Sequence, residues 1–150
     1  MGESGAGDLD FWIGHWDARW DDGTGTVSRG TSTVTREVAG LAVLERFEVG
    51  PPEPFSGMSI SWQDGTTGAW RQTWVDSAGS GWTFVGGRQV DGTVELATPE
   101  RVDDEQVFKR MVFSGFERDA FDWRWEASAD GVLWTPRWAI RYTRQEPGSG

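Results

Sequence analysis

A carboxylic acid stands among apolar residues on one face of a predicted strand. Alternate side chains of a strand share a face, and in residues 41–49 one face reads Leu41, Val43, Glu45, Phe47 and Val49. Burial raises the pKa of a carboxylic acid toward neutrality, where a side chain transfers protons best. We therefore predict that Glu45 is a general acid or base. The alternative is that Glu45 pairs with a neighbouring arginine and only satisfies the interior.

Two further side chains are candidates for the same chemistry. Asp76 shares a strand face with Trp70, Gln72 and Trp74, and we predict that it is a second acid or base. The alternative for Asp76 is to cap the turn that begins at Ser77. The hydroxyl of Tyr142 is predicted to donate a hydrogen bond to a ligand carbonyl.

Tryptophan dominates the aromatic content of the chain, with eleven tryptophans against one tyrosine and one histidine in 150 residues. Several of them are two positions apart in alternating patterns, which places both rings on one side of a sheet. Such a wall fills a core or lines a pocket for a flat or apolar ligand. The residues predicted to wall this pocket are Trp70, Trp74, Trp82, Phe84, Trp123, Trp125 and Trp138.

Few polar groups are predicted inside that wall. Gln72 accompanies Glu45, Asp76 and Tyr142. Residues 106–117 are apolar on both faces, so either Lys109 or Arg110 faces the interior. We expect no metal and no cofactor, because the chain has no cysteine and its lone histidine, His15, is expected at the rim or on the outside.

The elements that position these residues are short strands separated by glycine-containing turns. Asp-Gly pairs recur along the chain, for example at Asp64-Gly65 and Asp130-Gly131, and no long helical period is present. We predict an all-β, antiparallel up-and-down barrel of about eight to ten strands, since closure removes exposed edges. A helical turn within residues 8–14 is predicted to plug one end. The predicted strands are 16–21, 26–38, 41–49, 57–63, 69–76, 81–86, 89–97, 106–117, 121–128 and 134–143.

The remaining composition limits the class of partner. A formal net charge of −10 disfavours nucleic acid and anionic membranes, and no apolar run reaches the roughly 18 residues of a membrane span. The start of the chain lacks the basic and apolar regions of a signal peptide, so we expect a cytoplasmic monomer or homodimer. We predict one domain over residues 8–144, with disordered ends at residues 1–7 and 145–150.

Three groups of residues resemble a known family. Residues 11–17, Phe-Trp-Ile-Gly-His-Trp-Asp, resemble the opening Gly-x-Trp motif of lipocalin-like (calycin) barrels. Residues 70–77, residues 125–131 with Trp134, and residues 142–144 resemble a widespread bacterial calycin-like family of unknown function. The resemblance covers about residues 8 to 144 and implies an up-and-down barrel with a central cavity. Haem-binding calycins use a histidine late in the chain, and this chain has none there.

Two functions follow from a resemblance to lipocalin-like barrels and from the interior acid. The first is a cofactor-independent cyclase or isomerase of specialised metabolism, which acts on a hydrophobic or aromatic small molecule through an interior carboxylate. The second is a carrier or sensor that binds such a molecule without transforming it. A third hypothesis is a partner-binding module that uses exposed aromatic residues.

Overall fold

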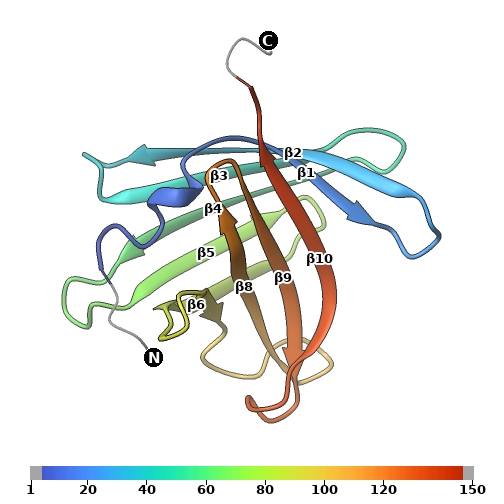
Figure 1. Ribbon diagram of the computed structural model, residues 1–150. Helices are drawn as coiled ribbons and strands as arrows, with labels where there is room; N and C mark the ends of the chain where they lie inside the picture. Colours follow the sequence, from blue (N-terminus) through green and yellow to red (C-terminus); the bar gives the residue numbers. More distant parts are fainter. Residues whose placement is uncertain (1–4, 147–150) are drawn as a thin grey trace.

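The computed structural model describes residues 5–146, in which ten antiparallel strands close into a barrel (Figure 1). Each strand pairs with its neighbour along the chain, and β10 pairs with β1 to complete the ring. The predicted fold class, an antiparallel up-and-down barrel with a short helical turn near the N-terminus, is confirmed. The elements are η1 (Asp10–Trp12), β1 (Gly14–Asp21), β2 (Val27–Glu37), β3 (Ala42–Val49), β4 (Phe55–Gln63), β5 (Trp70–Asp76), β6 (Gly81–Arg88), β7 (Val94–Ala97), β8 (Phe108–Glu117), β9 (Ala120–Ser128) and β10 (Thr135–Arg144).

Ten strands were predicted from the alternation of apolar and polar residues, and their boundaries differ most at β7. The pattern predicts a strand over residues 89–97, but β7 begins at Val94. The reason is a turn at Asp91-Gly92, where Gln89 N donates to Thr93 O at 2.7 Å and the Asp91 carboxylate accepts from Thr93 N at 3.0 Å. The side chain of an aspartate that bonds the backbone two residues on stabilises such turns.

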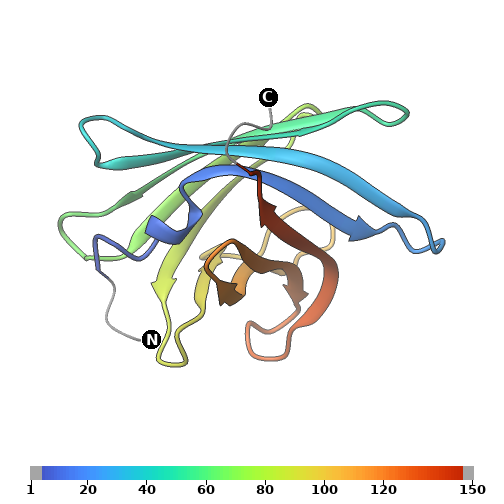
Figure 2. The same cartoon turned by 45° about the horizontal axis from the view of Figure 1, so that its top comes forward.

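Aromatic packing fills the end of the barrel next to η1. Leu9 and Trp12 are fully buried, so the helical turn contributes side chains to the core. The Trp12 ring meets Phe113 edge-on, with centroids 5.3 Å apart, and the Trp16 ring meets Phe121 in the same way at 4.8 Å. In Figure 2, η1 is the dark blue helical turn next to the start of β1. This packing closes one end of the interior.

The first and last strands, β1 and β10, contact each other next to this packed region. The Arg144 guanidinium, on the last strand, lies 4.2 Å from the ring centroid of Trp16 on the first strand. It also donates to Ile13 O at 2.9 Å, while Trp16 Nε1 donates to Trp12 O at 2.8 Å. A guanidinium over an indole face adds a cation–π attraction to these hydrogen bonds. The N-terminal and C-terminal motifs of the sequence therefore pack against each other.

The chain ends predicted to be disordered are described in part. Residues 1–4 and 147–150 lie outside the described residues. Trp70 Nε1 donates to Gly5 O at 3.2 Å, and Gln145 N donates to His15 O at 2.9 Å. His15 itself is exposed on β1. Within the described part of the chain, no helix combines the length and the apolar character that crossing a membrane requires.

Candidate functional site

The barrel interior holds a cavity of about 120 Å³. An apolar cavity of roughly 150 Å³ binds benzene, so this open space admits a group about as large as one aromatic ring. Aromatic side chains occupy much of the barrel interior and leave only this small space open. The cavity is lined by Trp12, Glu45, Phe47, Phe55, Gln72, Trp74, Asp76, Trp82, Phe84, Met111, Phe113, Trp123, Trp125, Trp138, Ile140 and Tyr142.

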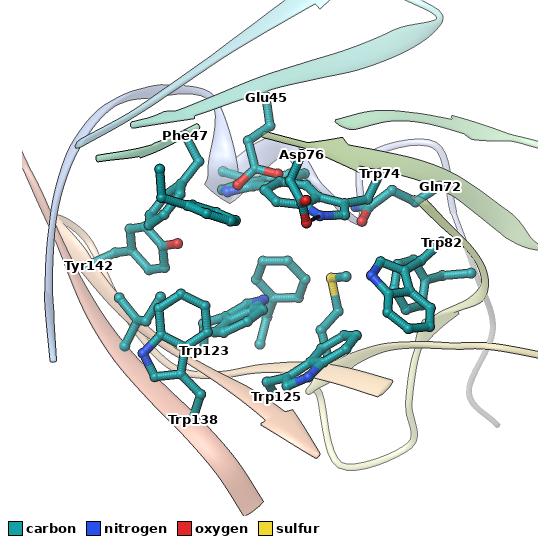
Figure 3. Close-up of a pocket in the computed structure, with 16 residues that line it drawn as sticks. Glu45, Phe47, Gln72, Trp74, Asp76, Trp82, Trp123, Trp125, Trp138 and Tyr142 are labelled. Atoms are coloured by element: carbon teal, nitrogen blue, oxygen red, sulfur yellow. Dashed lines mark hydrogen bonds between the residues drawn. The ribbon is translucent and has the colours of Figure 1, made fainter. Parts of the chain in front are cut away.

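Six of the eleven tryptophans line this cavity, and several of their rings contact one another (Figure 3). Trp123 and Trp125 alternate along β9 and are nearly parallel, with an interplanar angle of 8° and centroids 6.2 Å apart. The Trp138 ring stands at 88° to Trp123, and the Trp82 ring at 62° to Trp125. Aromatic pairs prefer these stacked and edge-to-face arrangements. The result is a set of rigid faces around a small open space.

Glu45 is the buried acid of the cavity. Its side chain comes from β3 and points into the open space (Figure 3), and the residue is only 8% exposed. Ser59 on β4 donates to Glu45 Oε1 at 2.8 Å. Burial raises the pKa of Glu45 to about 7, and the Ser59 hydrogen bond offsets only part of that rise. No lysine, arginine or histidine among residues 5–146 forms an ion pair with Glu45.

Tyr142 reaches the cavity from β10, and its hydroxyl points toward the open space (Figure 3). Its ring stacks on Phe121 with centroids 4.8 Å apart and an interplanar angle of 17°. Burial, and secondarily the charge of Glu45, raises the pKa of Tyr142 well above its ordinary value. The hydroxyl therefore keeps its proton and is a hydrogen-bond donor at neutral pH.

Asp76 and Gln72 reach the cavity from the same face of β5, and each also forms hydrogen bonds with other groups of the protein. Asp76 accepts hydrogen bonds from Trp74 Nε1 at 2.9 Å, Ala78 N at 3.0 Å and Ser80 N at 3.2 Å, so it caps the following turn as the alternative interpretation predicts. Gln72 Nε2 donates to Ser61 Oγ at 3.0 Å. Within residues 5–146, Gln72 Oε1 is buried without a hydrogen-bond partner.

Three residues predicted to contact a ligand do not line the cavity: Trp70, Lys109 and Arg110. Trp70 is on the predicted face of β5 but at the packed end, where it is fully buried beneath Gly5. Lys109 shares the inner face of β8 with Met111 and Phe113, but its Nζ lies 3.4 Å from Asp103 Oδ2 and from Glu105 Oε1, outside the cavity lining.

Arg110 is on the outer face of the barrel. Its guanidinium lies 4.2 Å from the ring centroid of Trp134, and its Nε donates to Glu126 Oε1 at 2.6 Å. The pairing of β9 and β10 shifts between Pro136 and Trp138. Trp134 and Trp138 are an even number of positions apart, which in a regular strand would place them on one face, but this bulge puts them on different faces of the barrel wall.

Six lining residues were not among the predicted ligand contacts: Trp12, Phe47, Phe55, Met111, Phe113 and Ile140. A signal for four of them is present in the sequence. Phe47 follows Glu45 by two positions and Ile140 precedes Tyr142 by two, so each shares a strand face with a candidate. Met111 and Phe113 likewise alternate with Lys109. Trp12 could not be found in this way, because it comes from η1 rather than from a strand.

The comparisons with known proteins were a scan against protein-family models and a search of curated proteins. Neither gives a match to this chain. The closed antiparallel barrel is consistent with a lipocalin-like (calycin) architecture. Among residues 5–146, no group of three or more histidine, cysteine, aspartate or glutamate side chains is arranged to hold a metal ion.

Proposed function

We propose that the protein binds a hydrophobic or aromatic small molecule in the cavity and acts on it by proton transfer through Glu45, as a cofactor-independent cyclase or isomerase. One observation carries this proposal: Glu45, a buried carboxyl group without a basic partner in the described chain, faces an aromatic cavity, and its pKa is about 7. A proton-transfer group works best when its pKa is near the working pH.

The chemistry uses two side chains with separate roles. Glu45 in its carboxylate form removes a proton from a ligand carbon next to a carbonyl group, and the C–H electron pair moves toward the carbonyl oxygen. Tyr142, which keeps its proton, donates a hydrogen bond to that oxygen as its negative charge grows. Glu45 then returns the proton at another carbon, so the ligand is isomerised without an oxidant or reductant. The tryptophan faces hold the ligand in one orientation.

The experiment that tests proton transfer does not require the natural ligand. The protein is incubated in deuterated buffer with a panel of small hydrophobic ketones, and deuterium in the recovered ketone is measured by mass spectrometry. We expect Glu45→Gln to slow incorporation by about 10²–10⁴-fold. Ser77→Ala, at the exposed turn after Asp76, is the control and keeps the wild-type rate. Equal rates in Glu45→Gln and wild type would refute proton transfer through Glu45.

A non-catalytic carrier is the second candidate. It is favoured by the hydrogen bonding of Asp76, which accepts three hydrogen bonds from the protein. Asp76 is therefore held as part of the turn, and among the described residues that line the cavity only one carboxyl group, Glu45, is available for proton transfer. A carrier binds members of the panel and incorporates no deuterium above the buffer rate. A partner-binding module has weaker support, since Phe116 is the one aromatic among the exposed large apolar side chains of residues 5–146.

A further inference from the structure

The cavity contains acids and a free acceptor but no basic side chain. Glu45 and Asp76 are its two carboxylic acids, and Gln72 Oε1 is a buried acceptor without a partner in the described chain. None of the sixteen lining residues is a lysine, arginine or histidine. Lys109, whose Nζ is 6.0 Å from the Trp125 ring centroid, is held instead by Asp103 and Glu105. An anionic ligand would therefore meet two acids and no counter-charge.

The aromatic faces add to this preference. An indole ring has a negative face, and it attracts a cation more strongly than the ring of tyrosine or phenylalanine does. The rings of Trp123, Trp125 and Trp138 meet in stacked and perpendicular pairs around the space that Glu45 enters (Figure 3). A positive group in this space therefore gains from the carboxylate on one side and from the ring faces on the other.

We propose that the ligand is a small hydrophobic amine in its protonated form, with the ammonium group between Glu45 and the indole faces. This inference rests on the proposed binding function and adds the chemical class of the ligand. The N–H groups of an ammonium add to the one hydrogen bond that Glu45 accepts from Ser59, and they supply a donor for Gln72 Oε1, which has none within residues 5–146. The apolar remainder is about one ring in size, which matches the open volume of about 120 Å³.

Such a ligand makes binding depend on pH through Glu45. The residues paired with Glu45 on the neighbouring strands are Val34 of β2 and Ser59 of β4, and neither titrates. The titratable groups that line the same cavity are Tyr142 of β10 and Asp76 of β5. Tyr142 keeps its proton because its pKa is raised. An ammonium stabilises the Glu45 carboxylate over its protonated form, so amine affinity rises as the pH rises to about 7 and beyond.

The test compares three probes of similar size and different charge: benzylamine, benzyl alcohol and benzoate. Their affinities for the full chain are measured by calorimetry at about pH 5 and about pH 8. At the higher pH we expect protonated benzylamine to bind about tenfold or more tightly than benzyl alcohol, and benzoate to bind least. In Glu45→Gln we expect the preference for benzylamine to shrink to within about threefold, and its rise with pH to disappear.

Two tryptophan variants separate the possible results. Trp138→Leu removes a cavity wall and weakens benzylamine binding, whereas Trp134→Leu alters a ring on the outer face under Arg110 and does not. If benzyl alcohol binds as tightly as benzylamine, and Trp138→Leu weakens both, the amine inference is wrong and the binding function stands. If benzyl alcohol binds and benzylamine does not, only the amine inference is wrong. If none of the three probes binds, or if Trp138→Leu changes none of the three affinities, the amine inference and the proposed cavity site are both wrong.

Discussion

Glu45 and Glu126 are two buried carboxylates in different surroundings. Glu126 lies between Arg110 Nε at 2.6 Å and Arg124 Nε at 3.2 Å on the outer face of the barrel. Glu45 has only the Ser59 hydroxyl at 2.8 Å, on the inner face. A buried charge is costly unless it is paired, so the carboxylate form is compensated at Glu126 and not at Glu45. This contrast is the residue-level reason to assign chemistry to Glu45.

The raised pKa of Glu45 predicts how stability changes with pH. The folded protein holds this proton up to about pH 7, whereas the unfolded chain releases it near the ordinary value of 4.5. Between these values the folded state binds more protons, so the free energy of unfolding falls as pH rises, by up to about 3 kcal/mol in total. Glu45→Gln removes this loss, and the variant gains on wild type between about pH 5 and pH 8.

Urea unfolding of both proteins at the two pH values measures this difference. Carboxylates with lowered pKa values, such as Glu105 beside Arg137, act on both proteins alike and cancel in the comparison. A pH dependence of stability that is the same in wild type and Glu45→Gln would contradict the assigned pKa.

At the scale of elements, β4 and β5 set the position of one cavity wall. The Trp74 ring of β5 lies directly over the backbone of Gly57 in β4, and a Cβ at Gly57 would be under 3.0 Å from that ring. Glycine is required at this position by close approach rather than by a special backbone conformation. The Trp74 indole is also held by its hydrogen bond to Asp76.

Gly57→Ala should displace the Trp74 ring and weaken ligand binding. We expect a loss of about 1–3 kcal/mol in the free energy of unfolding, because the added methyl group overpacks the contact. The affinity for benzyl alcohol should fall together with it. Gly65→Ala is the matched control, since a Cβ there meets nothing within 4 Å. Unchanged stability and affinity in Gly57→Ala would show that Trp74 does not form this wall.

The alternating pattern predicted correctly which face of a strand a residue occupies, but it did not predict how far along the barrel axis that residue lies. Alternation placed Glu45, Gln72, Asp76 and Trp125 on inner faces, because period two is a property of the strand itself. It did not show how far along the barrel axis a residue lies, so Trp70 was assigned to the pocket although it packs under Gly5. Depth depends on the stagger of the strands and on where η1 packs, and neither is encoded in local alternation.

The sequence pattern also did not predict where the charged side chain of Lys109 on β8 ends. Lys109 does share the inner face of β8, but Asp103 and Glu105 hold its ammonium group outside the cavity lining. That pairing comes from the connection between β7 and β8, which has no periodicity to interpret. The bulge near Pro136 had a similar effect, because it changes the face of Trp134 relative to Trp138.

The whole barrel divides into a packed end and an aromatic cavity. Trp16 and Phe121 fill the end near η1, while six tryptophans and Glu45 surround the open space. This space is small for a ten-stranded barrel, so a ligand larger than one ring must extend past the half-buried rings of Trp123 and Trp138 or displace them. The central claim is that this cavity, and no other part of the surface, receives the ligand.

The indole N–H signals of the eleven tryptophans test this claim most directly, because nuclear magnetic resonance detects each ring separately. During a titration with benzylamine, we predict shifts at Trp74, Trp82, Trp123, Trp125 and Trp138. The signals of Trp16, Trp70 and Trp134 should stay in place, since these rings lie at the packed end or on the outer face. Shifts that are absent from the cavity rings, or that are as large at Trp134 as at Trp138, would contradict a ligand site inside the barrel.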